Sequence, residues 1–145
     1  MKLDSTHDFT PGTASKLLPL IRSIVRDMSE LSDSINLQRQ QLVGLDEIGE
    51  MNSDDAYEEE VADVRSSLLE VEQRFESCRT ELEALGVEPH DPFDGSVDFP
   101  STLDNRKVNL CWRADDDSVR HWHELGEGTA ERKLLEPEVA LGPAV

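Results

Sequence analysis

Two stretches of the chain carry apolar residues at alternating steps of four and three positions. The first is Leu17, Ile21, Ile24, Met28, Leu31, Ile35, Gln38, Leu42 and Leu45, and the second is Tyr57, Val61, Val64, Leu68, Val71, Phe75, Cys78, Leu82 and Leu85. Steps of this kind place one narrow apolar stripe along an α-helix. The pattern therefore predicts two helices, at about residues 11–47 and 54–85, that pack as an antiparallel, coiled-coil-like hairpin.

Local signals mark the ends of these helices. Thr10 is a residue type that caps helices, and Pro11 suits the first helical position because its missing N–H would have no helical partner there. Gly86 is typical of the residue that ends a helix. Pro19 falls inside the first predicted helix, where a proline removes one backbone hydrogen bond, so we expect it to bend the helix axis.

The start of the first helix is apolar on more than its stripe, because Leu18, Leu20 and Val25 flank the stripe there. A wide apolar face has to be covered by something besides the second helix. In an antiparallel hairpin, this end lies beside the point where the chain leaves the second helix. We therefore expect the C-terminal residues to pack on Leu18, Leu20 and Val25.

After residue 86 the spacing of apolar residues no longer has the period of a helix, and prolines and glycines become frequent. Short alternating segments at 97–99, 107–113, 119–124 and 131–135 predict strands, with turns at 115–117 and 126–128. The expected fold class is α+β: a helical hairpin over residues 10–86 and a small antiparallel β-meander within 87–135, packed at the open end of the hairpin. Residues 1–9 are expected to be an extended lead-in, and residues 136–145 a loose tail.

Composition narrows the possible partners. The 145-residue chain has 32 acidic and 14 basic residues, a net charge of -18, which argues against nucleic acid and anionic membrane surfaces as partners. No apolar run approaches the length of about 20 residues that spans a bilayer. We see no signal peptide, and Cys78 lies on the predicted stripe, so a structural disulfide with Cys111 is not expected. These features predict a reduced, cytoplasmic protein.

Acidic residues gather around the predicted turn of the hairpin, and no basic residue lies among them. They are Asp46, Glu47, Glu50, Asp54, Asp55, Glu58, Glu59 and Glu60. One interpretation is a docking site for a basic protein partner or a divalent cation. The other is a solvated tip whose acids favour the positive end of the second helix dipole.

The meander carries the residue types that bind metals. Cys111, His121 and His123 share side-chain parity on two adjacent predicted strands, so Cys111 is expected opposite His121, with His123 on the diagonal. Such a set suits zinc or another divalent transition metal, with Asp98 or Glu124 as an oxygen ligand, although Glu124 has the opposite parity. In the alternative interpretation, the histidines are solvent-facing polar residues and Cys111 is a small filler. A nucleophilic Cys111 with His123 as its base fits by residue type alone.

Several short motifs resemble those of a known family. They are Phe9-Thr10 with Leu17-Leu18-Pro19, Val97-Asp98-Phe99-Pro100, Val108-Asn109-Leu110-Cys111-Trp112, Trp122-His123-Glu124 and Arg132-Lys133-Leu134-Leu135. Together they resemble the bacterial family catalogued as domain of unknown function 2203, over nearly the whole chain. The resemblance implies an architecture but no reaction, and it adds candidate functional residues: Trp112, Asp116, Trp122, Glu124 and Arg132. The family usually has Gly-Glu where this chain has Asp115-Asp116, so Asp116 would take the place of the glutamate.

Two functions follow as alternatives. The favoured one is non-enzymatic: a hairpin that serves assembly or partner binding, expected to pair with a second copy as a homodimer and to need no cofactor. The other is a metal-binding or small-molecule-binding protein, with or without catalysis, built on Asp98, Cys111, His121, His123 and Arg132. Its cofactor would be zinc or another divalent transition metal.

Overall fold

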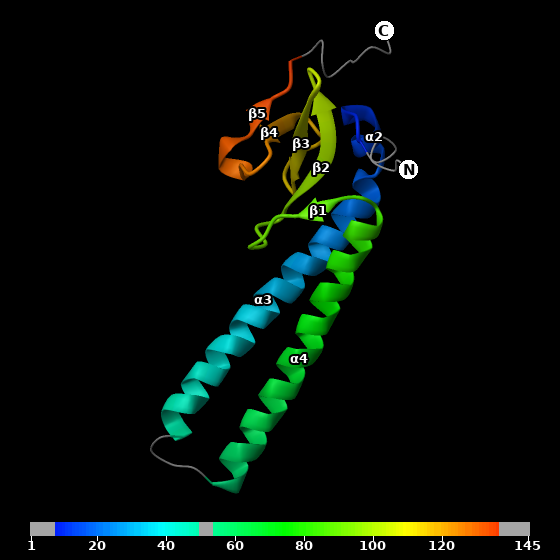
Figure 1. Ribbon diagram of the computed structural model, residues 1–145. Coiled ribbons are helices and arrows are strands. Elements are labelled where there is room, and N and C mark those ends of the chain that lie inside the picture. The colour runs from blue at the N-terminus through cyan, green and yellow to red at the C-terminus, as the bar shows by residue number, and fades with distance from the viewer. Residues whose placement is uncertain (1–7, 50–53, 137–145) are drawn as a thin grey trace. The chain divides into compact units, whose positions relative to one another are not determined.

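The computed structural model describes residues 8–49 and 54–136. Along the chain, the elements are α2 (Pro11–Lys16), α3 (Leu18–Gly49), α4 (Asp55–Ala84), β1 (Glu88–Pro89), β2 (Ser96–Leu103), β3 (Arg106–Arg113), β4 (His121–Glu124), the 3-10 helix η1 (Thr129–Glu131) and β5 (Lys133–Leu134) (Figure 1). Two long helices pack against each other, and a five-stranded antiparallel sheet follows them. The predicted α+β fold, a helical hairpin with an antiparallel sheet, is confirmed.

Contacts divide the described chain into two compact units. The first contains residues 8–26 and 79–136, and thus the sheet together with the helix ends at the open end of the hairpin. The second contains residues 27–49 and 54–78, the remainder of α3 and α4. Within these described ranges, neither helix has the length and apolar character that crossing a membrane requires.

In the second unit, part of the predicted stripe is buried. The buried residues are Met28, Leu31, Ile35, Val64, Val71 and Phe75. An ion pair of 2.8 Å between Arg39 and Glu72 joins the flanks of the two helices. Asp54 Oδ1 accepts the N–H of Tyr57 at 2.8 Å and so caps α4, which gives one of the acidic residues near the turn a structural role. Glu50 lies outside the described residues.

The first predicted helix is in fact two helices. Leu17 separates α2 from α3, and its N–H donates to the carbonyl oxygen of Ala14 at 3.1 Å. Pro19 therefore stands in the first turn of α3, where its missing N–H would have no partner within the helix. The prediction that Pro19 bends one continuous helix was wrong. The predicted cap is confirmed, because Thr10 Oγ1 accepts the N–H of Thr13 at 3.1 Å, at the start of α2.

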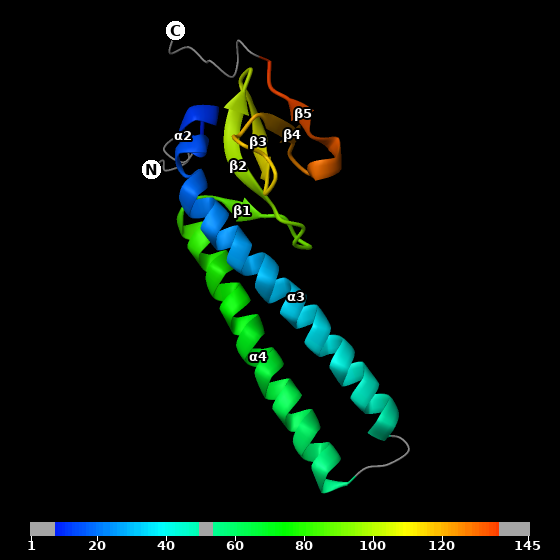
Figure 2. The ribbon, with the colours of Figure 1, turned by 180° about the vertical axis from the view of Figure 1, so that it is seen from behind.

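The five strands follow one another across the sheet in chain order, each antiparallel to the next (Figure 2). β2 and β3 pair along their full length and are joined by Asp104 and Asn105, whose positive φ angles of 53° and 63° are typical of a two-residue type I′ turn. β3 and β4 pair with Cys111 opposite His121, the register that the sequence predicts. β2 begins one residue earlier and ends four residues later than the predicted strand at 97–99.

One face of the sheet forms the core of the first unit. Its side chains are buried: Val97, Phe99, Val108, Leu110 and Trp112. The Phe9 ring contacts Phe99 edge to face at 5.1 Å, and the Arg22 guanidinium of α3 lies 5.8 Å from the Trp112 ring centroid. Leu18 and Val25 are buried, whereas Leu20 is 49% exposed. The prediction that Leu20 is covered was therefore wrong.

Candidate metal centre

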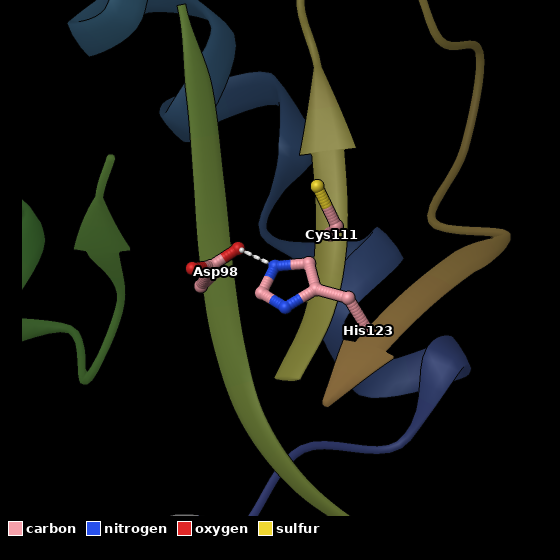
Figure 3. A group of neighbouring side chains, drawn as sticks. All are labelled: Asp98, Cys111 and His123. Carbon is pink, nitrogen blue, oxygen red and sulfur yellow. Dashed lines mark hydrogen bonds and ion pairs between the residues drawn. The ribbon is translucent and has the colours of Figure 1, made fainter. Parts of the chain in front are cut away.

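Three side chains from three neighbouring strands converge on the opposite face of the sheet. Asp98 on β2, Cys111 on β3 and His123 on β4 each offer a possible ligand atom, and these atoms all lie within 4.8 Å of one another (Figure 3). The strand register explains the convergence. Asp98 and Cys111 are direct cross-strand partners, whereas His123 pairs with Asn109 and reaches Cys111 on the diagonal.

This group is polar and yet buried. Cys111 and His123 are fully buried, and the Asp98 side chain is 14% exposed. Side chains of this kind are costly to bury unless they are hydrogen-bonded or bound to a metal. The neighbouring η1 is tied to the start of β2, because the Thr129 hydroxyl donates to Ser96 Oγ at 2.9 Å.

The hydrogen bonds of His123 determine which of its ring nitrogens can bind a cation. Nδ1 lies 2.9 Å from the main-chain carbonyl oxygen of Glu124. A carbonyl oxygen only accepts hydrogen bonds, so Nδ1 carries a proton and donates. Nε2 faces Asp98 Oδ1 at 2.9 Å. In a neutral imidazole, therefore, the Nε2 lone pair points at a carboxylate oxygen, and a proton or a metal cation has to lie between them.

The surroundings shift the protonation of the other two residues. Burial raises the pKa of Asp98 above its ordinary value, although the nearby His123 opposes the shift. Burial, and then the charge of Asp98, raises the pKa of Cys111 to about 11, while Arg132 and Thr129 pull it the other way. Cys111 is thus a protonated thiol at neutral pH unless a cation displaces its proton.

The same geometry does not support Cys111 as a nucleophile activated by His123. Both ring nitrogens of His123 are occupied, one by the Glu124 carbonyl and the other by Asp98. No hydrogen bond joins the imidazole to the sulfur (Figure 3). A thiol whose pKa is raised, and to which no histidine nitrogen is hydrogen-bonded, is a poor nucleophile.

A second charged pair lies beside the group. Arg132 binds Asp116 with both terminal nitrogens, at 2.6 Å from Nη1 to Oδ2 and 3.2 Å from Nη2 to Oδ1. Burial would raise the pKa of the Asp116 carboxyl, but the hydrogen bonds from Arg132 and from the Arg113 main chain outweigh it and lower that pKa. Trp112 Nε1 donates to the main-chain oxygen of Asp116 at 3.0 Å. Two of the residues singled out by the family resemblance, Trp112 and Arg132, therefore contact a third, Asp116.

The structure places the remaining predicted residues away from the three converging ligands. His121 is opposite Cys111 in register but outside the group, and its Nδ1 is buried with no hydrogen-bond partner among the described residues. Burial, followed by the charge of Arg132, lowers the pKa of His121. The Glu124 carboxylate pairs with Arg106 at 2.6 Å, and the hydrogen bond from His123 goes to the Glu124 main-chain carbonyl. Trp122 is half-buried on the core-facing parity, with the Lys133 ammonium 4.8 Å from its ring centroid.

Sequence reasoning missed several polar residues around the site. Asp94 Oδ1 accepts the N–H of Ser96 at 2.9 Å, and Thr129 Oγ1 lies 3.2 Å from Asp94 Oδ2. His90 Nδ1 contacts the carbonyl oxygen of Pro92 at 2.9 Å. Ser96 has the parity of Asp98, so a longer predicted strand would have found it. Asp94 and His90 lie in the loop between β1 and β2, where no periodic signal marks them.

Comparison with known proteins places the chain in a family. The pattern of the uncharacterized conserved proteins named DUF2203 matches residues 7–135, which is most of the chain. The protein therefore belongs to this family, as the sequence motifs predict. Neither the curated proteins nor the solved structures yield a significant match to it.

Proposed function

We propose that the protein binds a divalent transition metal, such as zinc, through Asp98, Cys111 and His123. The geometry of His123 carries the proposal: its Nδ1 is held by the Glu124 carbonyl, and its Nε2 faces a carboxylate oxygen at 2.9 Å. Metal-binding histidines are commonly oriented in this way by a main-chain carbonyl. Ligand atoms of a tetrahedral zinc site lie about 3.4–3.6 Å apart, so small side-chain movements would bring these three into range.

Charge and chemistry support the same site. A thiolate from Cys111 and a carboxylate from Asp98 together neutralise a dication, while His123 stays neutral. The mixed sulfur, nitrogen and oxygen donors suit zinc and similar metals better than magnesium or calcium. Because thiols stay reduced in the cytosol, the proposal fits the cytoplasmic location that the sequence predicts.

Metal analysis of the full chain, purified without an affinity tag or chelator, tests the proposal. We expect inductively coupled plasma mass spectrometry to find one equivalent of zinc or cobalt per chain. Protein loaded with cobalt should show a sulfur-to-cobalt charge-transfer band. Asp98→Asn and Cys111→Ser, which preserve side-chain shape, should lower the affinity at least about tenfold. In Asp98→Asn the amide can donate to His123 Nε2, so the metal-free fold should persist.

The control is Cys78→Ser, which removes the other cysteine, located in the second unit. It should bind cobalt as the wild type does. Equal affinities in the wild type and in Cys111→Ser, or no stoichiometric metal in the wild type, would contradict the proposal.

Exposed apolar residues on the second unit favour a further role in self-association. Leu37 and Ile48 lie about three turns apart on one face of α3 and are 60% and 56% exposed. We propose that this surface pairs with a second copy of the chain to form a homodimer, because water-exposed leucine and isoleucine gain stability when covered.

Sedimentation of the full chain over a range of concentrations tests the dimer. We expect the wild type to sediment as a dimer and the double variant Leu37→Glu with Ile48→Glu to sediment as a monomer. Leu125→Glu is the matched control, because Leu125 is equally exposed but lies in the first unit. A wild type that stays monomeric at high concentration would refute self-association and leave the metal proposal untouched.

A further inference from the structure

The main-chain carbonyl that orients His123 belongs to the next residue, at the end of β4. This oxygen, on Glu124, lies 2.9 Å from His123 Nδ1 and also accepts the N–H of Glu127 at 3.1 Å. A carbonyl oxygen has two lone pairs, so it can accept both hydrogen bonds. The orientation of the His123 ring therefore depends on where the turn after β4 holds this carbonyl.

That turn is closed by the second of these hydrogen bonds. The bond joins the first and fourth residues of the turn, Glu124 and Glu127, and Gly126 at the third position has a φ of 86°. A positive φ at the third position is typical of a type II turn, where glycine fits without strain. The main-chain geometry of the turn thus sets the direction of the Glu124 carbonyl.

The side chain of Glu127 holds the same residue a second time. Its Oε1 accepts the main-chain N–H of Glu124 at 3.0 Å, so Glu127 contacts both the N–H and the C=O of Glu124. Lys133 Nζ, on the neighbouring strand β5, lies 3.7 Å from the same Oε1. Because the Glu127 side chain is 35% exposed, it can be shortened without opening a cavity in the core.

We infer that Glu127 is a positioning residue of the proposed metal centre. By holding the N–H and C=O of Glu124, it keeps that carbonyl where it accepts the Nδ1 proton of His123. The Nε2 lone pair of His123 then stays directed at Asp98. Contacts of this kind hold a metal-binding histidine in one tautomer and one orientation. The inference rests on the proposed function and assigns a role to a residue that supplies no ligand atom.

Two variants of the full chain separate the hydrogen bond of Glu127 from its charge. Glu127→Ala removes the acceptor, and we expect it to bind cobalt about three- to tenfold more weakly than the wild type. This loss is smaller than the roughly 10- to 100-fold typical when a direct partner of a ligand is removed. Glu127→Gln removes the charge but keeps an oxygen that can accept the Glu124 N–H, so it should bind cobalt as the wild type does.

Proton NMR of the cobalt-loaded protein reports on the His123 ring itself. The N–H of a cobalt-bound histidine gives a signal far outside the ordinary range, and His123→Asn should lack this signal. We expect the Nδ1 proton of His123 to exchange with water several-fold faster in Glu127→Ala, because its acceptor is held less firmly. A glutamate that only stabilised the turn would lower the unfolding free energy of the metal-free protein without changing this exchange rate.

Glu131→Ala is the matched control. Glu131 Oε1 accepts the N–H of Gly128 at 2.7 Å, which is again a carboxylate bond to a main-chain N–H three residues earlier. This bond lies at the start of η1 and not at the carbonyl that His123 contacts. The cobalt affinity of Glu131→Ala and the exchange of its His123 proton should match those of the wild type.

The outcomes distinguish this inference from the proposed function. Cobalt affinity and proton exchange that stay unchanged in Glu127→Ala would overturn the positioning role and leave the metal site standing. If Glu127→Gln were as impaired as Glu127→Ala, the charge and not the hydrogen bond would be responsible, and the positioning role would be wrong. A wild type that binds no cobalt would overturn the metal site and this inference with it.

Discussion

Cys111 combines complete burial with a thiol pKa raised to about 11. Because the thiolate is the reactive form, a rise of about two pKa units lowers its population about 100-fold at neutral pH. We expect iodoacetamide to alkylate Cys111 in the metal-free native protein at least about 100-fold more slowly than in the unfolded chain. Timed alkylation at pH 7.5, followed by mass spectrometry in a Cys78→Ser background, measures both rates. Similar rates would mean that the sulfur is accessible.

Asp116 makes the stability of the folded protein depend on pH. Its pKa is lowered in the folded protein, so its contribution to stability is present above the ordinary pKa of about 3.9 and is lost as the pH falls through the lowered value. Asp116→Asn should cost about 1–3 kcal/mol of unfolding free energy at pH 7, because Arg132 loses its charged partner. The difference should shrink at pH 3.

Urea unfolding of the wild type and Asp116→Asn at the two pH values measures these differences. A loss that is the same at pH 3 as at pH 7 would show that the Asp116 charge is not involved.

Sequence parity predicted the strand register of Cys111 and His121, but not which ligands meet. Parity places Asp98, Cys111, His121 and His123 on one face, and the structure brings together three of them. The fourth, His121, is the direct partner of Cys111, and yet the diagonal His123 is the one that converges. Sheet twist and side-chain torsions decide between direct and diagonal neighbours, and neither can be read from residue spacing.

At the scale of elements, the β2–β3 turn offers a clear test. Asn105 has a φ of 63°, a left-handed conformation that asparagine tolerates and most other side chains do not. Asn105→Ala should lower the unfolding free energy by about 1 kcal/mol, whereas Asn105→Gly should be neutral or stabilising because Asp-Gly favours this turn. Thermal unfolding of the two variants provides the comparison, and an alanine variant as stable as the glycine variant would contradict it.

The long helices were predictable because the spacing of their apolar residues recurs many times along the chain. The short elements were not, because their few residues show no recurring spacing. The apolar stripe continues from Leu17 to Ile21 across the break between α2 and α3, so side-chain spacing alone could not show that the main chain is interrupted there. Pro19 was the available signal, but it marks a helix start as readily as a bend. Strands β1 and β5 have two residues each, too few for an alternating pattern.

For the whole molecule, metal binding should affect the two units differently. All three proposed ligands lie in the first unit, so a bound cation should slow local opening there and leave the second unit unchanged. We expect zinc to slow amide hydrogen exchange in peptides covering residues 96–124 but not in those covering 58–75. Asp98→Asn should abolish the difference between zinc-loaded and zinc-free protein. Equal slowing in both sets of peptides would indicate that zinc binds elsewhere.

The first unit is assembled from two separated parts of the chain, residues 8–26 and 79–136, and α3 and α4 leave and re-enter it at Arg26–Asp27 and Cys78–Arg79. In sequence, the second unit thus lies between the two parts of the first unit. Taking seven residues out of each helix keeps the apolar stripes in phase. Evolution can therefore lengthen or shorten the second unit in whole heptads while the residues of the sheet stay unchanged.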